Sequence, residues 1–296
     1  MNINLEKDNL LICSYKLHIL IKEKSPHCLI KKYISQVHSI LDYFQNTQLQ
    51  IKPIRFYEFY INYITKWIYS LIITSKHLKS SKYIYLASQF MITLINNVDY
   101  VNINELHKLD IFITLSTLLI NLKHFKQTPS IKLYIKLLKS YLNLYYQIDN
   151  SKILNTNDPY ELGFLLESCL KIRLIIKYNI IDSKLLYKLY DRLLKQSRIS
   201  LNKIQFKQYS INSDAYKWYS LCIGLEAIKI LDNYYINKKF NDIYNKNVKV
   251  ILKYYSMKRN IISNFKNYSY NKGNCNAHKD INMIMLENTD YPILTI

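Results

Sequence analysis

Basic side chains recur at spacings of three, four or seven residues in three segments between residues 129 and 260. They are Lys132, Lys136 and Lys139; Lys184, Lys188, Arg192 and Lys195; and Lys239, Lys246, Lys249 and Lys253. Successive residues of an α-helix turn by about 100°, so the four that begin at Lys184 fall within about 80° of one another. Stripes of this kind can neutralise successive phosphates of a nucleic acid. If the three helices are neighbours, we expect one continuous basic groove.

The charge of the whole chain allows two interpretations. Lys and Arg together number 41 against 21 Asp and Glu, a formal net charge of +20. An anionic partner, nucleic acid or a membrane surface, would explain this excess. An AT-rich coding sequence would also favour lysine over arginine, but it explains the shortage of acidic residues less well. Amphipathic helices in general also place lysines outward for solubility, so both interpretations of the stripes stay open.

Residue patterns that support catalysis are missing from the sequence. Gly163, Gly224 and Gly273 are the three glycines, and they lie far apart, whereas phosphate-binding loops need clustered glycines. The sequence contains no HExxH motif, no nucleophile elbow and no cluster of carboxylates. We therefore expect a protein that is not an enzyme and has no cofactor.

The cysteines indicate a reducing compartment. Cys13, Cys28, Cys169, Cys222 and Cys275 are odd in number and form no CxxC pair, so we expect reduced thiols that lie mostly in the core. Cys275 and His278 form one CxxH pair, but no second pair lies nearby, and no metal site is expected.

The sequence offers further candidates for a membrane span, a targeting peptide and aromatic contacts to a ligand. The longest uncharged run, residues 83–98, is too short and too polar for a membrane span. The N-terminal residues make a poor signal or transit peptide, and an intracellular protein is expected. Trp67 and Trp218 are predicted to be core residues. Tyr134 and Tyr187 are candidates for stacking on bases.

Helices must position these residues. Proline or a capping residue precedes most of the runs with apolar residues at three- and four-residue spacing, as at Asp158-Pro159. The predicted helices are 5–22, 26–45, 53–77, 82–97, 104–124, 129–147, 158–178, 183–199, 213–235 and 239–265. In helix 183–199 the apolar stripe of Leu186, Leu189, Tyr190 and Leu193 lies opposite the basic stripe.

These helices pair into about five antiparallel hairpins of roughly fifty residues. One internal echo supports a repeat, because Asn102-Ile103-Asn104-Glu105 matches Asn155-Thr156-Asn157-Asp158 at an offset of 53 residues. A single hairpin cannot cover its own apolar face, so stacked neighbours are expected. The predicted fold is therefore all-α, an α-solenoid-like array over residues 1–266, with an irregular bundle as the alternative. Residues 267–296 are Asn- and Lys-rich, and a largely disordered tail is expected, with a docked segment near 284–286.

Two predicted hairpins, 104–147 and 158–199, resemble the helical repeats of the heptatricopeptide and octotricopeptide class, including FAST-kinase-like and RAP-domain proteins. The residues that carry the resemblance are Glu105, Leu109, Phe112, Leu133, Tyr134 and Leu138, and then Tyr160-Glu161-Leu162, Leu165 and Leu185-Leu186-Tyr187 with Leu189. The resemblance covers about a third of the chain and implies an organellar, for example mitochondrial, RNA-binding or ribosome-associated protein. The hairpins here are longer than that class expects, and no RAP-like domain follows them.

The function expected first is a non-catalytic helical-repeat protein that binds RNA with little sequence preference, in an organellar ribonucleoprotein. The alternative is a protein-binding scaffold or assembly subunit, because helical arrays offer large surfaces that need no charge. An enzyme ranks third. Residues 1–100, whose predicted second helices lack basic stripes, are expected to do something other than grip an anion.

Overall fold

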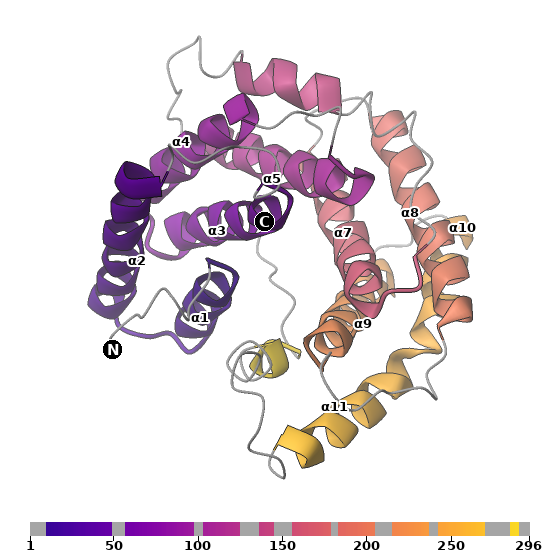
Figure 1. The fold of residues 1–296 in the computed structure, drawn as a ribbon. Helices are drawn as coiled ribbons and strands as arrows, with labels where there is room; N and C mark the ends of the chain where they lie inside the picture. The colour runs from indigo at the N-terminus through magenta and orange to yellow at the C-terminus, as the bar shows by residue number, and fades with distance from the viewer. Residues whose placement is uncertain are drawn as a thin grey trace. The chain divides into compact units, whose positions relative to one another are not determined.

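The structure, a computed structural model, describes residues 10–48, 57–97, 103–124, 136–144, 156–178, 183–204, 215–236, 242–269 and 285–289. All regular structure in these residues is helical, so the predicted all-α class is confirmed (Figure 1). The helices are α1 Leu10–Lys22, α2 His27–Gln48, α3 Tyr57–His77, α4 Ser81–Asn97, α5 Glu105–His124, α7 Pro159–Tyr178, α8 Ser183–Lys203, α9 Ala215–Ile236, α10 Asp242–Leu252 and α11 Tyr255–Ser269. Residues 136–144 are also helical.

The helix predicted over residues 239–265 was wrong, because the chain forms α10 and α11 there with a turn at Lys253 and Tyr254 between them. The amides of Lys253 and Tyr254 bond carbonyls three residues back, which tightens the chain and ends α10. The buried apolar residues on the two sides of the break, Ile251 and Ile261, are ten residues apart, a separation that a single helix could also give. Periodicity alone therefore could not reveal the turn.

Contacts divide the chain into two compact units, unit 1 within residues 1–150 and unit 2 within residues 151–294. The sequence predicts one repeat domain over residues 1–266, with no boundary at this point. The continuity of a single helical array through both units stays a prediction. Most of the predicted tail lies outside the described residues, but α11 extends to Ser269 and Met285 is fully buried.

In unit 1 the first helices of the hairpins lie in a row, with α1 against α3 and α3 against α5. Two contacts, Thr65 with Asp110 and Asn62 with His107, each join α3 to α5 at a separation of 45 residues. Equal separations along two helices mean that the helices run parallel. The second helices, α2 and α4, pack on this row and meet where the rings of His38 and Phe90 lie 5.4 Å apart.

The two described hairpin turns of unit 1 have the same backbone geometry. Lys24 and Lys79 have φ values of 53° and 48°, and the amide that follows each bonds a carbonyl five residues back, at 2.9 Å in both turns. This is the Schellman ending of a helix, in which glycine is the usual residue because a side chain at positive φ costs about 1 kcal/mol. The turns are side by side, because the rings of His27 and His77 lie 5.5 Å apart.

In unit 2 the most extensive helix contact joins α7 to α9. The second helices lie together, with α8 on α7, α10 on α9, and α8 beside α10 (Figure 1). Ser220 donates to the carbonyl of Tyr160 across 60 residues of sequence, whereas the α8–α10 contacts span 49 and 52 residues. Equivalent helices of successive hairpins are therefore packed in parallel, as in unit 1. The sequence separation between them varies, so the hairpins do not have one fixed length.

The α7–α9 contact depends on two glycines. A Cβ atom built on Gly163 would lie against the carbonyl oxygen of Ser220 and 2.6 Å from the amide nitrogen of Leu221. One built on Gly224 would lie 2.8 Å from the Cα of Gly163. Real Cβ atoms do not approach backbone this closely, so the helices can pack at this distance because neither residue has a side chain.

Alanine at Gly163 or Gly224 is therefore expected to destabilise the protein, although alanine is the better helix former. At an open helical position the change would add about 1 kcal/mol of stability. Here the methyl group meets backbone that cannot turn aside, which costs about 1–3 kcal/mol or more. Thermal unfolding checks the sign, with Asn233→Ala on the exposed side of α9 as the control. A higher midpoint in either glycine variant would contradict the close contact.

The His27–His77 pair should make stability depend on pH. Burial first, and then the positive charge of His27, lower the pKa of His77 below its usual 6.5. Neighbouring Lys76 adds positive charge on the same turn of α3, and its own pKa is lowered by burial. The unfolded chain then binds a proton more readily than the folded one, so stability falls as the pH drops below about 6.5.

We expect the midpoint of thermal unfolding to fall less between pH 7.5 and pH 5.5 in His77→Gln than in the unsubstituted protein. The control is Lys82→Gln, an exposed position in the first turn of α4. An equal loss in the His77 variant would mean that the pair contributes nothing to the pH dependence.

Candidate nucleic-acid interface

The basic stripe on α8 lies on the exposed side of that helix. Ser183–Lys203 contains six basic residues and one acidic residue, Asp191. Lys184, Lys188 and Lys195 are exposed, and Arg192 is half-buried. The four residues of the predicted apolar stripe on the opposite side are at most 1% exposed. The helical spacing read from the sequence thus describes both sides of α8 correctly.

Asp191 offsets part of this charge. Its carboxylate lies 2.6 Å from Nζ of Lys195, one turn further along α8. The Lys195 side chain is 57% exposed, so solvent screens the pair and it contributes little to stability. Five of the six basic residues of α8 remain in excess of its acid.

A second stripe lies on the neighbouring helix. Lys246 and Lys249 of α10 are exposed, and so is Lys253 in the turn that follows. The buried side of α10 carries Val248 and Ile251. Both stripes therefore point away from the α7–α9 layer, onto the outer side of unit 2.

Two hydrogen bonds join the helices that carry the stripes. Arg198 donates from Nη1 to Oδ1 of Asn247 at 3.1 Å, and the Tyr254 hydroxyl donates to Oδ1 of Asn202. Both bonds join the C-terminal half of α8 to the α10 segment in the same direction, so the two helices run parallel and the α10 row begins near the end of the α8 row. We call Lys184, Lys188, Arg192, Lys195, Lys246, Lys249 and Lys253 the basic face.

Of the three predicted stripes, two lie on helices of unit 2 that are in contact. Lys136 and Lys139 are exposed but belong to unit 1, where Lys136 donates to Oδ1 of Asn96. Lys132 and Lys239 lie outside the described residues, as do Tyr134 and the CxxH pair. What the structure brings together is an outer face made by two helices.

Sequence reasoning missed some contributors and over-weighted others. Arg198 and Asn202 join the helices, but the predicted helix ended at residue 199 and left Asn202 out. Tyr187, a stacking candidate, is half-buried and has the guanidinium of buried Arg173 at 5.7 Å from its ring centroid. Its ring already has an internal partner. Trp67 and Trp218 are buried, as predicted.

The described cysteines are free thiols, and all except Cys28 are buried. Burial raises the pKa of the Cys169 thiol to about 12, so it stays protonated and unreactive. Within the described residues, no three His, Cys, Asp or Glu side chains are grouped so that they could hold a metal ion. Among the described helices, none combines the length and apolar character that a membrane crossing requires.

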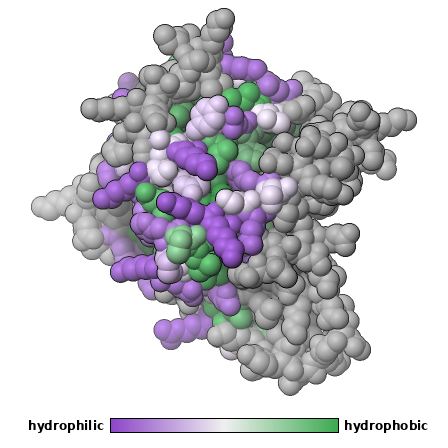
Figure 2. All heavy atoms as spheres, turned by 90° about the vertical axis from the view of Figure 1, so that its left-hand side faces the viewer, coloured by the Kyte–Doolittle hydropathy of each residue, from purple (hydrophilic) through white to green (hydrophobic). Residues whose placement is uncertain are grey.

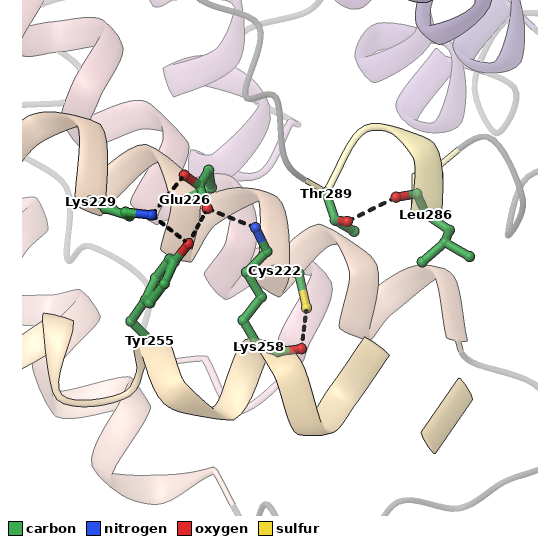
Figure 3. Close-up of polar contacts among 7 residues, drawn as sticks. All are labelled: Cys222, Glu226, Lys229, Tyr255, Lys258, Leu286 and Thr289. Atoms are coloured by element: carbon green, nitrogen blue, oxygen red, sulfur yellow. Dashed lines mark hydrogen bonds and ion pairs between the residues drawn. The ribbon is translucent and has the colours of Figure 1, made fainter. Parts of the chain in front are cut away.

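A cluster of charged and polar groups joins α9 to α11 in unit 2 (Figure 3). Lys258 donates to Oε2 of Glu226 at 2.7 Å, and the Tyr255 hydroxyl donates to the same oxygen at 2.5 Å. Lys229 donates to the Tyr255 hydroxyl at 3.1 Å, and this bond, followed by the charge of Glu226, raises the pKa of Lys229. The four groups are hydrogen-bonded to one another, and in this way they link α9 to α11.

We expect Lys258→Met to cost about 3 kcal/mol, because it leaves the carboxylate of Glu226 without its closest ammonium group. The Lys258 and Glu226 side chains are 5% and 12% exposed, so water cannot replace the lost partner fully. Glu226→Leu combined with Lys258→Met should recover most of the loss. The control is Lys195→Met, which breaks an exposed pair and should cost less than about 1 kcal/mol. Equal costs in chemical unfolding would show that the cluster is no link.

Comparison with known proteins adds no family to this description. No protein-family model matches the chain, and no curated protein and no solved structure is similar enough to count as a match. The chemistry of the chain therefore has to be argued from its own residues.

Proposed function

We propose that this protein is a non-catalytic RNA-binding protein whose basic face contacts the phosphate backbone. The observation that carries the proposal is that two parallel helices in contact, α8 and α10, each carry an exposed lysine row, with Asp191 as the one acidic residue within α8. Successive residues in each row are one helical turn apart, about 5–6 Å along the axis. Rows of this kind neutralise phosphates and read no base edges, so binding with little sequence preference is expected.

The net charge of +20 supports the same proposal. A strongly positive chain attracts polyanions from a distance and is steered toward them, most of all at low salt. The buried and reduced thiols agree with action in a reducing compartment inside the cell.

Reversal of two charges on the basic face tests the proposal. Affinity for single-stranded RNA should fall linearly with the logarithm of salt concentration, by about 0.7 for each phosphate neutralised. Lys184→Glu with Lys188→Glu should weaken binding and lower that slope by about 1.4, since two contacts are lost. Fluorescence anisotropy over a range of salt measures both quantities.

The matched control is Lys123→Glu with Lys177→Glu, which changes the net charge equally at exposed positions outside the basic face. An equal loss in the control would mean that total charge, and not the basic face, binds RNA. Binding that does not weaken with salt would refute phosphate contact altogether.

The alternative is a scaffold that binds protein. The rows of parallel first helices in each unit support it, because stacked hairpins present extended surfaces. A protein partner that stays bound in stoichiometric amounts after nuclease treatment, together with no salt-sensitive RNA binding, would favour the scaffold.

A further inference from the structure

The two hairpin turns of unit 1 form a surface that the basic face does not include. The turns α1–α2 and α3–α4 are side by side through the contact of His27 with His77. We call the residues of these turns and of the first helical turns that follow them, 22–32 and 76–85, the turn end. It lies in unit 1, whereas the basic face lies in unit 2.

The turn end is strongly positive. Its lysines are Lys22, Lys24, Lys31, Lys32, Lys76, Lys79 and Lys82, and its one acidic residue is Glu23. All of these lysines except half-buried Lys76 are exposed. Neither α2 nor α4 has an acidic residue in its first turn, so the positive ends of two helix dipoles add to the lysine charge.

Two of these lysines occupy positions that favour glycine. Lys24 and Lys79 are the non-glycine residues with positive φ in the described part of the chain, and each follows the last turn of a first helix. A side chain there is disfavoured by the backbone conformation. A charged side chain at both turns, at the same end of unit 1, indicates that the charge has a use that offsets this strain.

Exposed apolar side chains accompany the charge. Leu29, in the first turn of α2, is 41% exposed, and Tyr85, just past the first turn of α4, is 56% exposed. Because α2 and α4 meet at His38 and Phe90 and their preceding turns are adjacent, both residues lie near the same end of the unit. Figure 2 shows the side of the molecule that carries α1 and α2, where hydrophobic residues stand among a majority of hydrophilic ones.

We propose that the turn end docks on the surface of a membrane that contains anionic lipids. Lysines gain from the negative surface potential of such a membrane, roughly fivefold in affinity for each residue close to it. Leucine and tyrosine can enter the boundary between headgroups and acyl chains, and the helix N-termini face the lipid phosphates. A dissolved polyanion would use the lysines but would gain nothing from Leu29.

This proposal goes beyond RNA binding and does not rest on it. The full chain is mixed with vesicles of phosphatidylcholine alone or of phosphatidylcholine with phosphatidylserine, and the sedimented fraction is measured. We expect binding to the anionic vesicles, weakened by salt, and none to the neutral ones. No binding to the anionic vesicles at low salt would overturn the proposal.

Lys24→Gly with Lys79→Gly separates docking from folding. Glycine suits the backbone at both positions, so this variant should unfold at the same temperature or higher. Its affinity for anionic vesicles should nevertheless fall by about 25-fold, since two lysines are lost. Undiminished affinity in this stable variant would contradict a role for the turns.

The apolar contribution has its own test, because Leu29→Ser with Tyr85→Ser changes no charge. Vesicle affinity should fall while RNA affinity stays unchanged. Loss of RNA affinity with undiminished vesicle binding would instead assign the turn end to RNA and sink the membrane proposal. Lys184→Glu with Lys188→Glu should show the opposite pattern, with RNA affinity lost and vesicle binding kept, so failure of either proposal is visible independently of the other.

Discussion

Burial of the first helix of each hairpin on nearly every side is the constraint on which the rest of the structure depends. All residues from Leu162 to Arg173 in α7 are buried, and so are those from Leu109 to Leu122 in α5. A helix covered all round has no face left for solvent, so its neighbours must supply the polar surface. The second helices do this, which is why the lysine rows are found on α8 and α10.

The same burial governs every polar group that the first helices contain. Hydroxyl groups such as those of Ser70 and Ser116 donate to carbonyls one turn back in their own helix and so need no outside partner. Charged groups pair, as Lys171 does with Glu167 at 2.8 Å. Because a buried charge without a partner is costly, such pairs are sites where one substitution does the most damage.

Local signals in the sequence were sufficient for the helices but not for what joins them. Asp158 accepts hydrogen bonds from the amides of Tyr160 and Glu161, and thus caps α7 where its type predicted a helix start. The corresponding cap of α5 is Asn104, whose side chain accepts a hydrogen bond from the amide of His107, and the two caps are 54 residues apart, one more than the offset of the sequence echo. Capping is local chemistry, and sequence reasoning recovers it to within a residue.

Contacts between segments that are distant in sequence have no local sequence signal comparable to a helix cap. In the sequence, Gly163 and Gly224 are two isolated glycines. Their wide separation indicates only that they do not form a phosphate-binding loop. Nothing local distinguishes a glycine at a helix contact from one on an exposed turn. The turn end was missed for a related reason, because basic stripes were sought along single helices. Its charge is assembled from two turns that are 55 residues apart in sequence.

The two basic surfaces differ in what accompanies the charge, and that difference separates their partners. Beside the basic face the exposed large apolar side chain is Ile199. A single exposed apolar residue among charged residues is normal on any protein surface. At the turn end two large apolar side chains adjoin the lysines, and two helix N-termini point the same way. Charge alone suits a polyanion in water, whereas charge beside exposed apolar groups suits a boundary between water and hydrocarbon. Residues 1–100 lack basic stripes on their second helices, and the anionic partner proposed for them is therefore of a different physical kind.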